Sequence, residues 1–455
     1  MRAPPADPGD AHSRLLPEVA RVVRGIHPRP PVFRSAVLPT ALALACTPVR
    51  TAGQLPSADA AELGLGGSSP SLARGFAAVA ANPAALGAPD GPAFSATLLS
   101  LGVRQGLDPV GLGELADWED RDLPRSVREE WLERVRSNGS ESGGAGAEVT
   151  LAALSRGRVG LQLSTRAFGR VSLNADAAEL LLFGNAGLTG EPRDFDLAGS
   201  RGDGFVVTTA AVAWGSGVGP FAGGRLRVGA TLSLSMGHVV ALARDNGSGL
   251  TGDPTELDLR FPVLHVGGAT GSLDHGHGVG LDLGTLWTDG SRTVGIVVRN
   301  VVNTFEWRVE DLVFRPGSAL FDPEESSTDF DERPAGEAPP VLLDALEDMS
   351  FRPAVAAGAS WRARPDLVIE ADLELRRGGG MSVEPDARLG VGAEYRPRPE
   401  VPLRGDLAVV ERGIQGALGA GLELGSFMVA GAVAVRTGAL DDMLLGTFGV
   451  SFRKW

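Results

Sequence analysis

Long stretches of this chain alternate between apolar and polar residues, and this alternation limits the possible folds more than any other feature. Over residues 159–173 one parity is mostly apolar, while the other carries Gln162, Arg166 and Arg170. Over residues 226–242 the same split recurs, and we assign Val240 and Leu242 to the apolar parity there. Side chains of a β-strand point alternately to opposite faces. Each stretch therefore predicts a strand with one apolar and one polar face.

The length of these stretches separates two kinds of β protein. Strands of soluble proteins typically run about 5 to 6 residues, whereas strands that cross a membrane need about 9 to 11. Further long stretches cover residues 367–375, 387–395, 414–424 and 427–435. From Phe94 to the end we count about 14, and bacterial barrels have an even number. The prediction is an all-β fold: a closed antiparallel transmembrane β-barrel with a plug-like N-terminal segment and short helices in its loops.

Composition fits a β-rich chain and argues against several functions. The sequence holds 63 Gly and 43% hydrophobic residues, with 5% aromatics. A net charge of −14 without a basic cluster opposes nucleic-acid binding, which needs concentrated cationic surface. A Gly-x-Ser-x-Gly elbow and a phosphate loop ending in Gly-Lys-Ser/Thr are both missing from the sequence. We therefore expect neither an enzyme nor a cofactor.

An apolar run near the N-terminus is typical of an export signal. Residues 35–49 follow Arg34 and precede small residues, and the run is too short to cross a bilayer. Cleavage is expected near Gly53 or Gln54, so the only cysteine, Cys46, falls inside the leader. Lipidation at Cys46 and a disordered tail are the alternatives. The expected organisation is an extension with signal peptide (1–53), a plug-like segment (54–91) and a barrel (92–455).

Two short motifs just before the first predicted strand resemble the FadL-like outer-membrane superfamily. Residues 63–67 read LGLGG, and residues 73–86 contain Asn82, Pro83 and Ala84. In that superfamily a glycine-rich segment and an Asn-Pro-Ala motif precede the barrel. The group includes fatty acid transporters, aromatic-hydrocarbon channels and shuttle proteins of the type IX secretion system. The resemblance implies that these three residues belong to a plug and that the ligand is a small hydrophobic molecule.

Two other regions strengthen this resemblance. An acidic insert at residues 126–135, expected to be helical, and residues 177–185 are similar to an uncharacterised branch of the same group. The last strand ends in Trp455, which resembles the signal read by the barrel-assembly machinery, although Trp455 lies off the parity of Phe448 and Phe452. The resemblance implies a Gram-negative outer membrane, with its lipid and the barrel-assembly machinery as partners.

Charged residues on the polar parity are the candidates for lining the lumen. They are Arg166, Arg227, Glu370, Asp372, Glu374 and Arg388. Ladders of compensating charges are expected to have a structural role more often than to form a selective binding site. At the ends of apolar parities, Trp287, Trp361 and Tyr395 are placed as an interfacial aromatic girdle would place them.

We predict no metal site. His275 and His277 are spaced to share one face of a strand, but a third ligand is not evident, so residues 274–277 are interpreted as a polar turn. His238 lies on the apolar parity and is expected to be hydrogen-bonded or interfacial. The acidic run 322–348 lacks calcium-loop spacing. Its prolines predict an irregular external loop, with a short helix within residues 337–346.

Three functional hypotheses follow from these patterns. The first is an outer-membrane channel for small hydrophobic molecules. The second is a secretion shuttle or surface scaffold without transport activity, whose external loops, especially residues 306–350, bind another protein. The third is a secreted soluble β-domain, in which the apolar faces would pack against each other.

Overall fold

The structure, a computed structural model, describes residues 55–455 except residues 68, 268–271, 323, 383, 412 and 439–442. The expected signal peptide, residues 1–53 with Cys46, lies outside the described residues. So does residue 54 of the expected plug-like segment.

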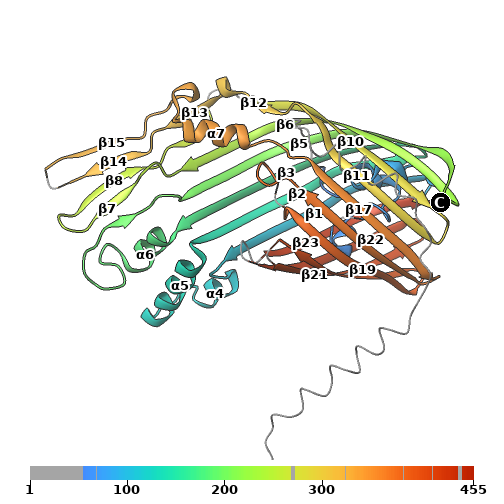
Figure 1. Cartoon of the computed structure of the whole chain (residues 1–455), viewed down its shortest axis with the longest axis horizontal. Helices are drawn as coiled ribbons and strands as arrows, with labels where there is room; N and C mark the ends of the chain where they lie inside the picture. The colour runs from blue at the N-terminus through green and yellow to red at the C-terminus, as the bar shows by residue number, and fades with distance from the viewer. Residues whose placement is uncertain are drawn as a thin grey trace, which may run out of the picture. The chain divides into compact units, whose positions relative to one another are not determined.

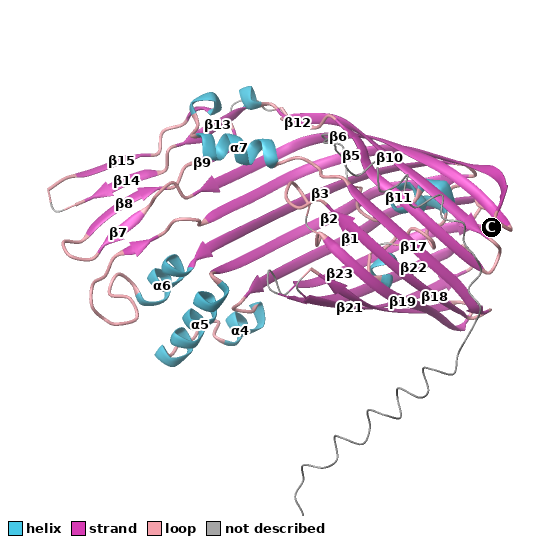
Figure 2. Cartoon of the chain, viewed as in Figure 1, coloured by secondary structure: helices cyan, strands magenta, loops and turns pink. Residues whose placement is uncertain are grey.

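Fourteen antiparallel strands form a closed barrel, as predicted. Every neighbouring pair is hydrogen-bonded, and the pairing of the first strand with the last closes the ring. The strands, in their order around the ring, are β1 (Phe94–Asp108), β2 (Ser140–Arg156), β3 (Val159–Asn174), β5 (Arg201–Phe221), β6 (Gly224–Arg244), β10 (Gly276–Thr288), β11 (Arg292–Asn303), β17 (Ala354–Arg364), β18 (Leu367–Arg376), β19 (Ala387–Arg398), β20 (Val401–Val410), β21 (Gly413–Leu424), β22 (Phe427–Gly438) and β23 (Met443–Lys454). Figures 1 and 2 show this ring of tilted strands.

The apolar parity of these strands faces outward. Leu232, Leu407 and Val433 are more than half exposed, although they lie at the centre of long strands. The polar parity is buried inside, as at Ser164 and Glu370. An apolar outer face suits contact with lipid. A ring without free edges is also required there, because hydrocarbon offers backbone groups no hydrogen-bond partner. The chain is thus an outer-membrane type of barrel, and the soluble alternative is wrong.

One stretch departs from the predicted parity. The register of β5 with β6 shifts between Val206 and Val207, and His238 is the extra residue opposite this step. The bulge reverses the parity beyond it. Val240 and Leu242, which we assigned to the apolar outward face, consequently point inward and are fully buried.

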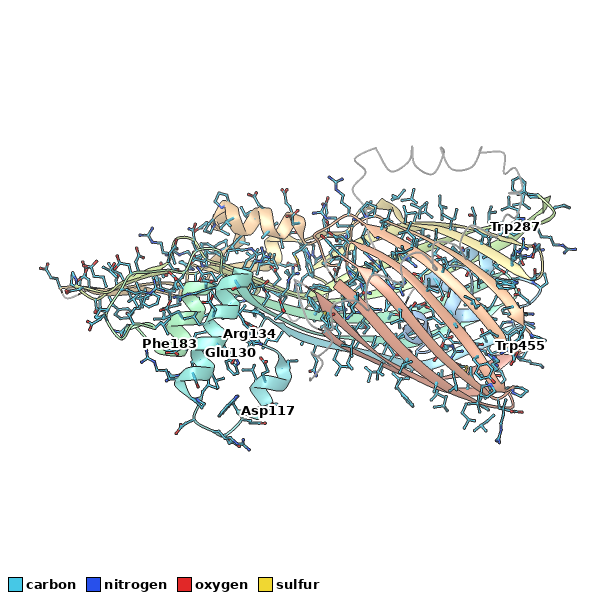
Figure 3. The ribbon with its side chains drawn as sticks, turned by 60° about the horizontal axis from the view of Figure 1, so that its bottom comes forward. Asp117, Glu130, Arg134, Phe183, Trp287 and Trp455 are labelled. Carbon is cyan, nitrogen blue, oxygen red and sulfur yellow. The ribbon has the colours of Figure 1, made fainter. Side chains whose placement is uncertain are left out.

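Short turns join the strands at one end of the barrel and long loops join them at the other, which by analogy with bacterial barrels marks the periplasmic and extracellular ends. Outward aromatic residues gather at the short-turn end, where Trp214, Trp361 and Tyr395 are each at least 40% exposed. Figure 3 shows Trp287 and Trp455 at this end, far from the extracellular Asp117 and Phe183. The predicted girdle residues therefore lie at one interface.

Strands β2, β3, β5 and β6 continue past the barrel into an extracellular extension (Figure 1). A second, five-stranded sheet lies there, made of β4 (Phe195–Asp196), β7 (Gly249–Thr251), β8 (Glu256–Arg260), β14 (Ser318–Phe321) and β15 (Ser326–Asp329). Its helices are α4 (Leu112–Asp117), α5 (Arg125–Asn138), α6 (Ala175–Phe183) and α7 (Pro340–Asp348). The expectation of irregular structure over residues 322–348 is wrong where β15 falls within it, whereas α7 agrees with the short helix expected within residues 337–346.

The remaining short elements connect the extension to the barrel. They are β9 (Val263–Val266), β12 (Glu306–Trp307), β13 (Leu312–Arg315), β16 (Arg333–Pro334), η6 (Val309–Asp311) and η7 (Ala335–Glu337). On the inner face of β5 and β6, helix α7 buries Leu342 and Leu346 in a cluster with Phe305 and Trp307. Of the helices in the described part of the chain, not one is long and apolar enough to cross a membrane.

A charge on the outward face tests the orientation of the strands. We expect Leu283→Arg, at the outward-facing centre of β10, to destabilise the barrel by about 2 to 4 kcal/mol, the cost of an arginine on the lipid face near the bilayer midplane. Denaturant unfolding in lipid vesicles measures the change. Phe330→Arg, in the exposed extracellular sheet region, is the control and should cost less than about 0.5 kcal/mol. Equal losses of unfolding free energy in the two variants would contradict the assignment of the apolar strand face to the lipid.

Candidate functional site

Residues 55–93, here called the luminal segment, lie inside the barrel. The segment contains η3 (Glu62–Leu65), η4 (Gly75–Ala77), α3 (Ala78–Ala81) and η5 (Pro83–Ala85). η3 packs against β19 to β22, η4 against β1 to β3, and η5 against β5, β6 and β10. Phe76 and Leu86 are fully buried by these contacts. The segment thus touches the wall on several sides and lies across the lumen (Figure 1, blue).

Asn82 fixes the middle of the luminal segment to the wall. Its side-chain amide donates hydrogen bonds to the carbonyl oxygens of Pro70 (3.0 Å) and of Thr285 on β10 (2.9 Å). Its Oδ1 accepts from the backbone N–H of Ala84 at 3.1 Å, which caps η5, and Pro83 stands at the first position of that helix. Asn, Pro and Ala therefore each fit one geometric need of this turn.

Glycines in the wall let the backbone of the luminal segment approach very closely. A Cβ placed on Gly229 of β6 would lie 2.3 Å from the carbonyl carbon of Pro83, and one on Gly284 of β10 would lie 2.2 Å from Oδ1 of Asn82. A Cβ on Gly215 would lie 2.4 Å from the carbonyl oxygen of Pro83, and one on Gly295 would lie 2.2 Å from that of Pro70. Only residues without a side chain leave room there.

Polar side chains of the wall complete the attachment. Arg227 donates to the carbonyl oxygens of Ala84 (2.9 Å) and Leu86 (2.5 Å), where the chain leaves η5. The carboxylate of Glu370 accepts from the hydroxyls of Ser69 (2.7 Å) and Ser71 (2.8 Å). Two of the six candidate lumen residues thus bind the luminal segment instead of each other.

The other four candidates form ion pairs with residues of the wall, on a neighbouring strand, on the next strand but one or on the same strand. Arg388 contacts Asp372 and lies 2.6 Å from Asp406. Glu374 accepts from Arg299 on β11 at 2.5 Å and from Arg376 at 2.6 Å. Arg166 lies 2.8 Å from Glu148 on β2. These contacts form the compensating ladder expected from the sequence.

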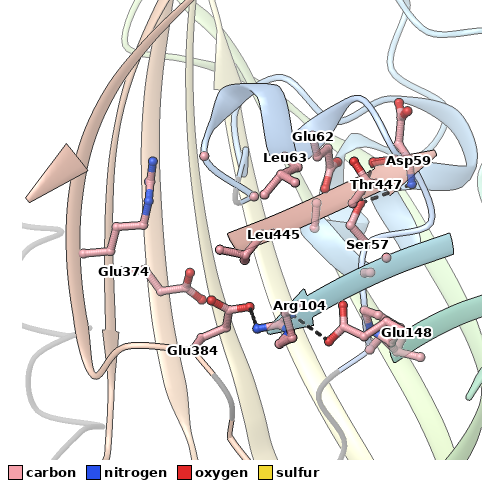
Figure 4. Close-up of a pocket in the computed structure, with 18 of the residues that line it drawn as sticks. Ser57, Asp59, Glu62, Leu63, Arg104, Glu148, Glu374, Glu384, Leu445 and Thr447 are labelled. Carbon is pink, nitrogen blue, oxygen red and sulfur yellow. Dashed lines mark hydrogen bonds and ion pairs between the residues drawn. The ribbon is translucent and has the colours of Figure 1, made fainter. Parts of the chain in front are cut away.

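A small chamber of about 110 Å³ lies between η3 and these charges (Figure 4). Arg104, Glu148, Glu384 and Arg436 line it, and none of the four is among the lumen-lining candidates chosen from the sequence. Arg104, Glu148 and Arg436 lie on the polar parity of their strands, which is a signal that could have found them. Glu384 lies in the loop between β18 and β19, where strand parity gives no such signal. The chamber has room for a few waters and not for a larger ligand.

An apolar groove of about 600 Å³ lies on the outer face of the extension. Its floor is made of small residues on four adjacent strands: Ala145 on β2, Gly169 on β3, Gly204 on β5 and Ala241 on β6. Its walls are larger apolar side chains, namely Leu107, Leu112, Val171, Leu173 and Val263. The groove lies toward the extracellular ends of these strands, because Gly169 is near the end of β3 and Ala241 is near the end of β6.

The histidines do not gather into a metal site. His275 is buried beside Asp311 at 3.4 Å, whereas His277 is mostly exposed and lies 3.6 Å from Asp274. His238 points outward and hydrogen-bonds Thr208 at 2.8 Å. Among the described residues, no group of three or more metal-binding side chains could hold an ion.

No protein-family model and no curated protein matches the sequence. Solved structures with a similar arrangement include the toluene transporter TodX of Pseudomonas putida, at 12% identity and a TM-score of 0.48, covering 89% of this chain and 99% of that one. A FadL homologue of Pseudomonas aeruginosa gives 12% identity and a TM-score of 0.45, over 88% and 98% of the two chains. The monoaromatic hydrocarbon channel CymD gives 11% identity and a TM-score of 0.45, covering 88% of this chain and 98% of that one. At this level of similarity, functional interpretation rests on the geometry of the chain itself.

Replacing Asn82 tests the attachment of the luminal segment. We expect Asn82→Ala to weaken its seating by about 1 to 3 kcal/mol, since the carbonyls of Pro70 and Thr285 lose their donor in a buried site. Amide hydrogen exchange over residues 75–88 measures this as faster exchange. Asn185→Ala, at an exposed loop residue, is the matched control. Unchanged protection in Asn82→Ala would show that the amide does not hold the segment.

Glu62 makes the seating of the luminal segment depend on pH. This residue belongs to the luminal segment and to no spanning strand; burial, with a smaller contribution from Asp59, raises its pKa from 4.5 to about 8. The seated state therefore binds a proton that a released segment would lose. The free energy that holds the segment in place should therefore fall as pH rises from about 4.5 to about 8, and it should change little at higher pH.

Hydrogen exchange over residues 58–66, measured at several pH values, checks this dependence. Glu62→Gln should remove the slope and protect the segment better at the alkaline end. A slope that persists in Glu62→Gln would assign the pH dependence to another group.

Proposed function

We propose that this chain is an outer-membrane channel that captures small hydrophobic molecules in the apolar groove. The groove is the observation that carries the proposal. Its surface is almost wholly apolar, its size suits a small organic molecule, and it lies on the outward face of the wall. In this proposal the solute enters the groove from outside the barrel.

The luminal segment acts as the plug in this proposal. Its fit against Gly229 and Gly284 and its hydrogen bonds to Arg227 and Glu370 support a state in which the lumen is closed. Asn82, Pro83 and Ala84 would be the centre of the plug, and residues 54–91 its expected extent. Passage would require this segment to shift. Recognition by the barrel-assembly machinery through Trp455 and export by the N-terminal leader stay predictions.

The extracellular extension favours a second candidate function. Its five-stranded sheet and helices α4 to α6 offer a large surface outside the membrane, as a secretion shuttle or scaffold would need. The two functions differ in which part of the extension they use, because the groove lies at its base and β14 and β15 lie in its second sheet.

Filling the groove tests the first function. A Cβ on Gly169 would meet only the carbonyl oxygen of Asp203 at 3.9 Å, so Gly169→Phe should fold while its ring occupies the groove. We expect its affinity for the apolar fluorophore N-phenyl-1-naphthylamine to fall about tenfold or more, equivalent to about 1.4 kcal/mol. Fluorescence titration in lipid nanodiscs avoids competition from detergent.

Val391→Phe is the control for this experiment. Val391 also faces outward, on β19, which β20 to β23 separate from the groove residues of β1. Equal binding by both variants, or no binding by the unaltered protein, would argue against capture in the groove.

A further inference from the structure

The loop between β18 and β19 turns into the barrel instead of standing outside it. Of the described residues of this loop, Met381 is buried in the cluster that includes Leu342 of α7, and Glu384 reaches into the lumen. The Glu384 carboxylate accepts from Arg104 of β1 at 2.7 Å and from Arg436 of β22 at 2.9 Å. One carboxylate from the β18–β19 side of the ring is thus held by two guanidinium groups on the side where the ring closes.

Glu384 separates two spaces. It lines the inner chamber above η3 and also an outer vestibule of about 260 Å³, whose other residues include Arg170, Arg201 and Glu411. Pro385 lines both spaces as well. Entry from the vestibule into the chamber therefore passes the contacts that Glu384 makes, and the loop forms a constriction distinct from the luminal segment.

The counter-charge of the arginines behind this constriction is distributed unevenly. Six arginines line the chamber, namely Arg104, Arg166, Arg299, Arg376, Arg388 and Arg436. The strands contribute Glu148 and Glu374 to the same lining, the luminal segment contributes Asp59 and Glu62, and the loop contributes Glu384. Arg388 is also paired with Asp372 and Asp406. Arg436 binds Glu384 and the amide oxygen of Gln415, so displacement of the loop takes away the carboxylate that it contacts. Although burial alone would raise its pKa, Arg104 and Arg436 hold the pKa of Glu384 far below its usual range, so that it stays ionised at neutral pH.

We propose that Glu384 is a resident counter-anion in an arginine-lined anion site, and that displacement of its loop opens a passage that prefers small anions. The site fits an oxyanion or halide, because two guanidinium groups already hold a carboxylate there. A hydrophobic molecule would have to break buried ion pairs without replacing them, which is unfavourable. A cation would meet Arg436 without the carboxylate that it contacts in the closed state. The inference rests on the proposed channel function but uses a different part of the molecule from the apolar groove.

Conductance of single barrels in planar bilayers under a KCl gradient tests this inference. The variants are compared in a background that carries Asn82→Ala, which weakens the seating of the luminal segment, because a seated segment would close the lumen behind the constriction. In this background we expect Glu384→Gln to open about tenfold more often than Asn82→Ala alone, since the amide keeps the shape but loses both charge-assisted contacts. Its reversal potential should lie toward that of chloride. Glu384→Asp, which keeps the charge, should stay close to Asn82→Ala alone.

Two further variants sharpen the result. Glu411→Gln removes a carboxylate from the vestibule without touching the constriction and should change neither opening nor selectivity. Glu384→Gln combined with Arg436→Gln should open but lose part of its chloride preference, because one of the arginines that creates it is gone. Migration of unheated and heated samples on a gel confirms that each variant folds.

Three results would overturn the inference: no added opening in Glu384→Gln, a preference for K⁺, or the same effect from Glu411→Gln. Binding of N-phenyl-1-naphthylamine, measured on the same preparations, separates this outcome from that of the channel proposal. If the fluorophore binds in the groove while Glu384→Gln behaves as Asn82→Ala alone, only the anion site is wrong. If Glu384→Gln passes chloride but the groove binds nothing, only hydrophobic capture is wrong.

Discussion

The structure depends on one requirement: inside a bilayer every backbone N–H and C=O must find a partner within the protein. The pairing of β1 with β23 meets it by removing both free edges of the sheet. Closure has a consequence for the interior, because the polar parity of every strand then faces an enclosed space and its side chains also need partners. The luminal segment and the ion pairs around Arg388 and Glu374 supply those partners. Closure of the ring and filling of the lumen are therefore two parts of one solution.

Polar side chains in the lumen find partners in two ways, and these two kinds of contact differ in how easily they can be broken. Arg388, Asp372 and Asp406 all lie on strands, so their contacts last as long as the barrel does. The contacts of Asn82 and Glu384 join the wall to a segment and a loop, which can move without breaking the sheet. Elements that move in function are expected among such locally held parts. The geometry thus places the adjustable contacts in series along the lumen.

Alternation along the chain was enough to predict the barrel, because the period of two is a local property of each strand. It failed at His238, where one extra residue reversed the faces of Val240 and Leu242; a bulge of this kind depends on the partner strand and leaves no mark in the alternation itself. The six lumen residues could be predicted from parity. Their partners could not, since Glu370 binds Ser69 and Ser71 almost three hundred positions away. Strands β14 and β15 were hidden by prolines and acidic residues that local propensity assigns to loops.

Apolar and charged surfaces are kept apart in this barrel, and their separation limits the route of any solute. The groove with Gly169 and Gly204 is apolar and lies outside the wall, whereas the chamber with Arg104 and Glu384 is charged and lies inside it. A hydrophobic solute gains free energy in the first and loses it in the second, because it cannot replace the ion pairs it would disturb. An anion has the opposite preference. If both kinds of solute use this protein, they must follow different paths, and only the anion would pass between Arg104 and Arg436.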